Sequence, residues 1–204
     1  YRPRPRLITD FYAYNTSVQR GDPVDQPQML GLHWVGDLML ECELEVTRAD
    51  GDALFELVEG GVRFRCQLDC KTGQAKFSID GLDNYEPTAQ TDVRGTGSHS
   101  VIFANIDNQL LLWVDGSPIA FDGPTTYPEL ENDRPVASES EPGDLMPARI
   151  GSRGAGLAVR HLRLWRDIYY IATDGRSPVS DYRRPNALLT QLRYQELLNF
   201  WSSP

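Results

Sequence analysis

The chain has 204 residues, a length at which a single all-β domain with a well-buried core is ordinary. Its formal net charge is −9 and only two of its 20 basic residues are lysines, so the clustered cations that a nucleic acid or an anionic membrane surface requires are missing. No apolar run approaches the ~18 to 20 residues that cross a bilayer. Because the chain begins without Met, we interpret it as a piece of a longer protein.

Apolar residues alternate with acidic ones over 38–46, which predicts a strand with one face in a core. Pairs such as Asp107-Asn108 and Asp115-Gly116 tolerate positive φ and are typical of hairpin turns. Many short strands joined by tight turns predict an all-β fold, an antiparallel two-sheet β-sandwich. Further strands are predicted at 53–58, 62–70, 75–79, 100–106, 110–114, 148–150 and 157–170.

Two later segments depart from this alternation. Residues 123–147 contain five prolines and six acids, which predicts a long acidic loop that is the least ordered internal stretch of the chain. In the C-terminal extension, 172–204, apolar residues after Pro185 recur at helical spacing and predict a short C-terminal helix. We expect one domain over 1–204.

The inward positions of the predicted strands define a candidate core. We expect these side chains to be buried: Leu40, Cys42, Leu44, Phe64, Leu68, Leu112, Val114, Leu162 and Leu164. Cys66 and Cys70 are too far apart along one strand to form a disulfide, whereas Cys42 could pair with Cys66 if their strands are neighbours. Three buried free thiols are the favoured interpretation.

Three glutamates, Glu41, Glu43 and Glu45, share one face of one predicted strand. Carboxylates ~6.6 Å apart suit an acid/base pair or calcium ligands. The E-x-E-x-E spacing lacks the central Asp of the E-x-D-x-x-E motif of sandwich-fold glucanases. Cross-strand ion pairs with Arg63 and Arg65 are therefore the favoured interpretation.

Aromatic side chains on the outward face are the candidate binding site. Alternation turns Trp113 away from the core, and Arg163 and Trp165 likewise. With Glu43 they form a candidate ligand-binding set that could stack on a sugar or a peptide. The competing interpretation is that the C-terminal helix or the acidic loop covers these rings.

No catalytic, metal or cofactor site is predicted. The three histidines, His33, His99 and His161, lie far apart in the sequence, and no serine lies in a nucleophile motif. The candidate calcium ligands are Asp107, Asp115 and Asp122. Turn formation already accounts for all three aspartates.

Parts of the sequence resemble known families. LWVDG at 112–116, AFDG at 120–123 and IG at 150–151 resemble concanavalin A-like (laminin G-like) jelly rolls. LITDFYAYN at 7–15, HWVGDL at 33–38, FRC at 64–66 and RDIYY at 166–170 look like the large insert of enlarged bacterial type I signal peptidases.

The second resemblance implies an accessory module of a membrane-anchored serine peptidase. The family's S-M-x-P nucleophile motif and its lysine motif are absent, so it implies a Ser/Lys dyad outside this chain. We therefore expect a non-catalytic, extracytoplasmic module that serves contact, spacing or substrate access. The alternatives are a carbohydrate- or peptide-binding lectin-like module of another surface protein and, ranked behind it, a sandwich-fold glycosidase.

Overall fold

The computed structural model describes residues 6–10, 33–129, 134–138 and 140–168. Contacts divide the chain into two units: Tyr1–Leu7 with Gly36–Asp167, and Ile8–Val35 with Ile168–Pro204. In the second unit, the described residues pair β1 (Thr9–Asp10) with β2 (His33–Trp34) in antiparallel fashion. The first unit contains the β-sandwich, to which all that follows refers.

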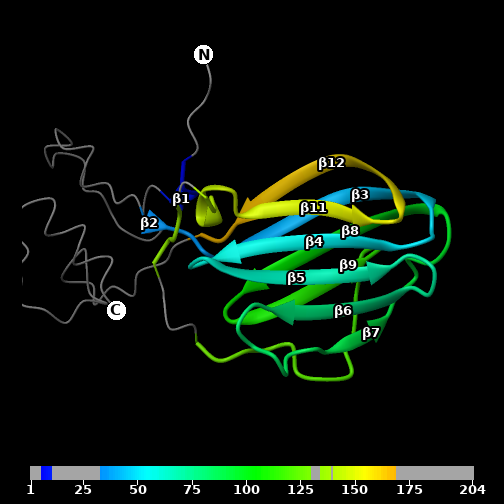
Figure 1. Ribbon diagram of the computed structural model, residues 1–204, viewed down its shortest axis with the longest axis horizontal. Coiled ribbons are helices and arrows are strands. Elements are labelled where there is room, and N and C mark those ends of the chain that lie inside the picture. The colour runs from blue at the N-terminus through cyan, green and yellow to red at the C-terminus, as the bar shows by residue number, and fades with distance from the viewer. Residues whose placement is uncertain (1–5, 11–32, 130–133, 139, 169–204) are drawn as a thin grey trace, which may run out of the picture. The chain divides into compact units, whose positions relative to one another are not determined.

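Two five-stranded antiparallel sheets make up this unit (Figure 1). The first sheet has the order β10-β9-β8-β3-β12 and the second has the order β11-β4-β5-β6-β7. The prediction of an antiparallel two-sheet sandwich is confirmed. The strands of the first sheet are β3 (Leu38–Arg48), β8 (Gly97–Ile106), β9 (Gln109–Val114), β10 (Ser117–Pro118) and β12 (Gly156–Arg166). Those of the second are β4 (Asp52–Glu59), β5 (Val62–Asp69), β6 (Gln74–Ile79), β7 (Thr88–Gln90) and β11 (Ala148–Arg153).

Buried side chains alternate along the strands as the sequence pattern predicts. Phe77 of β6 and Phe103 of β8 lie in contact across the two sheets, with ring centroids 5.7 Å apart, so the inner faces share one core. Each fully buried Leu or Phe side chain contributes about 1.5 to 3 kcal/mol. Seven of the nine predicted core residues are buried: Leu40, Cys42, Leu44, Phe64, Leu68, Leu112 and Val114.

The prediction is wrong for the other two, because Leu162 is 58% exposed and Leu164 is 40% exposed. Both belong to β12, which is an edge strand of its sheet. Leu164 lies opposite the buried Leu40 in the register, so it has the inward orientation that alternation predicts. Within the described residues, the opposite sheet therefore leaves this edge partly uncovered.

The turns follow the predicted chemistry. Asp107 and Asn108 join β8 to β9 with φ angles of 51° and 57°, and Asp115 and Gly116 join β9 to β10 with 51° and 78°. Two successive positive φ values match the type I′ hairpin turn, whose twist fits the twist of the strands.

Residues 119–147 cross from β10 of the first sheet to β11 of the second. The described residues of this crossover include an isolated bridge from Thr126 to Gln109 and a short 3-10 helix, η2 (Gly143–Leu145). That 123–147 is the least ordered internal stretch stays a prediction.

All three cysteines are buried and free, with Cys42 and Cys66 in opposite sheets. The predicted C-terminal helix and extension lie outside the described residues, and the single domain over 1–204 stays a prediction. Across the part that is described, no helix is long and apolar enough to cross a bilayer.

Candidate functional site

The outer face of the first sheet carries rows of aligned side chains. Residues directly opposite each other in antiparallel strands project from the same face. One row therefore runs Trp113, Ile102, Glu41, Arg163 over β9, β8, β3 and β12. The neighbouring row runs Leu111, Ala104, Met39, Trp165.

Further along the same face the rows become polar. Ser100 lies opposite Glu43, and Glu43 lies opposite Arg160. Ser98 lies opposite Glu45 in the next row. The face thus has an aromatic and aliphatic end and a hydroxyl- and charge-bearing end.

Trp165 is held in place at the apolar end while much of its ring stays accessible. Its indole Nε1–H donates to Glu41 Oε2 at 2.6 Å, and the Arg163 guanidinium carbon lies 6.0 Å from the ring centroid. Arg163 Nη1 also lies 3.5 Å from the other Glu41 oxygen. The side chain is 46% exposed, so the ring presents a supported apolar surface to solvent.

A β-bulge determines which side chains of β12 reach this face. The register shifts between Arg160 and Arg163, and His161 has a φ of 50°. The extra residue reverses the alternation. As a result Arg160 and Arg163 both lie opposite glutamates of β3.

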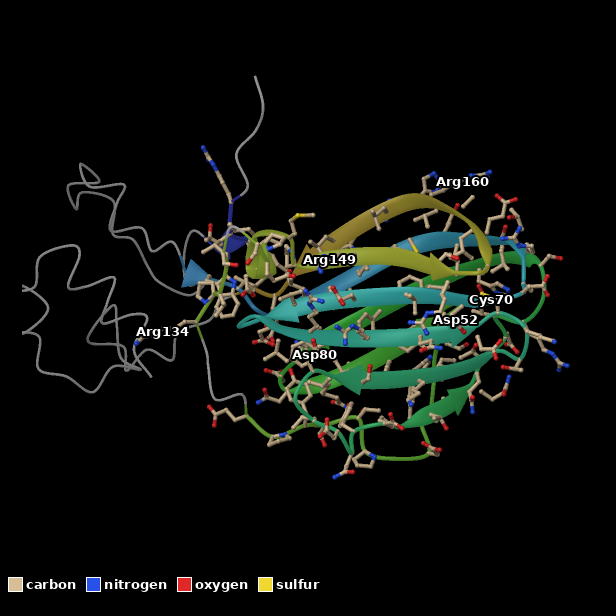
Figure 2. All side chains as sticks on the ribbon, in the orientation of Figure 1. Asp52, Cys70, Asp80, Arg134, Arg149 and Arg160 are labelled. Atoms are coloured by element: carbon tan, nitrogen blue, oxygen red, sulfur yellow. The ribbon has the colours of Figure 1, made fainter. Side chains whose placement is uncertain are left out.

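The three strand glutamates each have a basic partner on β12. Arg160 lies 2.9 Å from Glu45, and His161 Nδ1 lies 3.0 Å from Glu43. Figure 2 shows Arg160 beside β12, at the edge of the sandwich. These pairs are exposed, so each contributes little to stability, but together they set a pattern of donors and acceptors.

The predicted cross-strand partners of these glutamates are wrong. Arg63 and Arg65 lie on β5 of the second sheet, where Arg65 pairs with Glu56 at 2.8 Å and also with Asp80, and Arg63 pairs with Glu141. Arg149 of β11 completes this network by contacting Glu56 at 2.8 Å (Figure 2). Alternation along a strand shows which face a residue occupies, but not which strand is its neighbour.

All four predicted ligand-binding residues lie on the one face. Arg163 and Trp165 are in contact with each other, whereas Glu43 instead contacts His161. Trp113 is half-buried on β9, three strand spacings from β12, which is about 14 Å. The two tryptophans therefore mark opposite sides of the face and do not form one stack.

Sequence reasoning missed Glu41 as the partner of Trp165, and it missed Arg160. The strand alternation already placed Glu41 beside Glu43, so it could have been included with the aromatic set. Arg160 could not have been found, because its orientation depends on the bulge.

Two of the three candidate calcium ligands, Asp115 and Asp122, have structural partners. Asp115 accepts from the Ser100 amide at 2.8 Å and contacts His99 at 2.9 Å, while Asp122 accepts from the Thr88 amide at 2.7 Å. Within 6–10, 33–129, 134–138 and 140–168, no three His, Cys, Asp or Glu side chains are grouped to hold a metal. None of the hydrogen bonds of these described ranges joins a serine or cysteine to a histidine or lysine.

No family model matches this chain, and no curated protein matches it. Among solved structures, it is similar to the carbohydrate-binding module CBM66 from Bacillus subtilis, with a TM-score of 0.43 and 8% identity over 63% of this chain and 74% of that one. Galectin LEC-6 from Caenorhabditis elegans gives 0.43 and 13% over 63% and 84%. Galectin-11 from sheep gives 0.43 and 11% over 81% and 100%. Similarity at this level does not indicate a function. The function must be inferred from the outer face of the first sheet.

Proposed function

We propose that this sandwich is a non-catalytic binding module whose ligand is a carbohydrate, bound on the outer face of the β10-β9-β8-β3-β12 sheet. The observation that carries the proposal is the exposed Trp165 ring, fixed from one side by Glu41 and Arg163. A fixed ring loses little conformational freedom when a ligand packs on it, which favours binding.

The pattern of the face fits a sugar ring. Sugars present both C–H surfaces and hydroxyl groups, and recognition requires an apolar platform next to hydrogen-bonding side chains. Here the aromatic end adjoins Glu43, Ser100 and Arg160, which offer acceptors and donors to hydroxyls. An extended peptide presents similar chemistry. The experiment must therefore distinguish peptide binding from glycan binding.

The test is binding of the whole chain and of Trp165→Ala to a glycan array and, in parallel, to a random peptide library. We expect glycan binding by the parent chain and a loss of at least tenfold in affinity in the variant, which corresponds to about 1.4 kcal/mol. The matched control is Lys76→Ala, because Lys76 lies on β6 of the other sheet, where it pairs with Glu86. Binding to peptides alone, or equal loss in both variants, would contradict the proposal.

The parent protein is a separate proposal. The motifs at 33–38 and 166–170 support an insert of a membrane-anchored signal peptidase-like protein on the extracytoplasmic side, serving contact, spacing or substrate access. The residues before Tyr1 and after Pro204 in the full-length protein test it. A membrane helix followed by S-M-x-P upstream would support this parent, and a different domain there would exclude it.

A further inference from the structure

The first sheet has a long edge strand, β12, at the rim of the sandwich (top of Figure 1). Within the described residues, no strand pairs with the side of β12 that faces away from β3. The other edge strand of this sheet, β10, has only two residues, whereas β12 has 11. An edge strand presents backbone N–H and C=O groups to which another strand can bond. β12 is therefore the edge at which this sheet can be extended.

The backbone of Leu164 points to this free edge. One residue beyond the end of β12, the Asp167 amide donates to the Asp37 carbonyl at 3.1 Å, and the register from Arg163 to Arg166 is continuous with this pair. In an antiparallel ladder, residues that bond to the neighbouring strand alternate with residues whose N–H and C=O point the opposite way. Leu164, three residues before Asp167, belongs to the second kind.

The inward side chains of β12 are apolar and incompletely covered. Val159 lies opposite the buried Leu44, and Leu164 lies opposite the buried Leu40, so both project toward the interior. Even so, Val159 is 38% exposed and Leu164 is 40% exposed, and Leu162 between them is exposed as well. A strand added beside β12 would cover these side chains with its own inward residues.

The outward side chains of β12 define the charge of the strand that fits. Arg160 and Arg163 each pair with a glutamate of β3 and remain mostly exposed. A guanidinium has five N–H donors, so each arginine can pair with a second carboxylate on its other side. A strand on the free edge would adjoin the same side chains as β3 does. β3, with apolar residues inward and glutamates outward, therefore shows which pattern is complementary to β12.

A second copy of β12 does not have this pattern. Pairing two β12 strands would bring the outward basic residues of both copies together, and like charges on adjacent strands are destabilising. The formal net charge of −9 adds repulsion between two whole chains. The charges therefore favour an acidic partner segment over self-association.

We propose that β12 binds an extended segment of a partner protein as a sixth, antiparallel strand of the first sheet, and that acidic residues alternate with large apolar residues in that segment. The antiparallel direction follows the other strand pairs of this sheet. Main-chain hydrogen bonds to the end of β12 supply affinity, and the alternating side chains supply specificity. The proposal concerns the edge of the sheet and does not depend on a sugar bound to its outer face.

The test uses the whole chain and a fluorescent peptide with the sequence of residues 38–46 and Cys42→Ser, followed by fluorescence anisotropy. We expect saturable binding, and a loss of at least about tenfold in affinity when lysines replace the three glutamates of the peptide. Residues directly opposite each other in a hydrogen-bonded pair share one face, so an apolar residue of the peptide bonds to Leu164. N-methylation at the positions of Leu40 and Leu44 should therefore abolish binding, whereas N-methylation at the positions of Glu41 and Glu45 should change it less than about threefold.

A variant of the chain tests the same edge from the other side. Leu164→Glu places a carboxylate where the proposed segment is apolar, and we expect at least about tenfold weaker binding of the unmodified peptide. The matched control is Val136→Glu, since Val136 is 45% exposed and lies in the crossover. Thermal denaturation shows whether both variants are folded, and the N-methylated peptides test the edge without any variant.

Three results would overturn the proposal. The first is a folded chain that does not bind the peptide. The second is binding that the two N-methylated peptides, or the two glutamate variants, weaken equally. The third is a dimer of the parent chain in sedimentation velocity that Leu164→Glu dissociates, because a second copy would then occupy the edge.

Discussion

Single residues show how burial governs charge in this protein. Glu59 is a carboxyl group at the end of a strand, an ordinary position for glutamate, yet its surroundings favour the neutral form. Nothing in the local sequence indicates this, because the neighbours Asp37 and Asp144 are distant along the chain. The exposed glutamates of β3 are the contrast, since each meets a basic side chain of β12.

Glu59 makes the stability of the fold depend on pH in a defined direction. A carboxyl group whose pKa is raised on folding from 4.5 to about 7 stabilises the folded state. Its contribution to the free energy of unfolding is fully present below pH 4.5 and is lost as the pH rises through 7. The shift corresponds to on the order of 3 kcal/mol. We expect Glu59→Gln to raise the free energy of unfolding at pH 8 by roughly 2 kcal/mol, with little change at pH 4.5, as measured by urea denaturation. An equal effect at both values would rule out titration as the cause.

At the scale of elements, much of the sandwich could be predicted from the sequence. Period-two alternation identified β3, β4, β5, β6, β8 and β9, because a half-buried strand requires one apolar face. It could not show that β12 lies at an edge. Periodicity gives the direction of a side chain, whereas exposure depends on whether another layer covers it.

The same limit applies to the candidate site. Trp113, Trp165 and Arg163 were placed on the outer face by alternation alone. Their partners could not be predicted in the same way. The contact between Glu41 and Trp165 joins positions 124 residues apart, and the bulge at His161 has no clear sequence pattern. Register between distant strands is a tertiary property.

Because one strand is covered by the opposite sheet and the other is not, we predict that two leucine-to-alanine mutations cause unequal losses of stability. Leu44→Ala, at a position that is fully buried, should destabilise the protein by about 2 to 5 kcal/mol. Leu162→Ala should cost less than about 1 kcal/mol, since 58% of that residue is already exposed. Thermal denaturation of the two variants measures both. Comparable losses would show that β12 is covered in solution.

At the scale of the whole molecule, assays of catalysis test the proposal that the sandwich is a binding module. Catalysis needs a nucleophile within reach of a base or a suitably spaced pair of free carboxylates. The strand glutamates, which are the nearest approach to such a pair, each have a cationic or imidazole partner.

We therefore expect the chain to show no hydrolysis of a fluorogenic signal-peptide substrate or of a β-glucan panel. Glu41→Gln, Glu43→Gln and Lys71→Met serve as comparisons in the same assays. Turnover by the parent chain that vanished in one of these variants would identify a catalytic group and refute the proposal of a binding module.

The most direct test of the ligand face is a nuclear magnetic resonance titration with the glycan that binds most strongly on the array. We predict that the indole Nε1–H of Trp165 and the amides of Glu41, Ile102 and Arg163 shift together, because these residues share one face of the sheet. Amides of β5 and β6 should stay unchanged. Shifts confined to the second sheet, or saturable binding that leaves the Trp165 indole resonance in place, would contradict it.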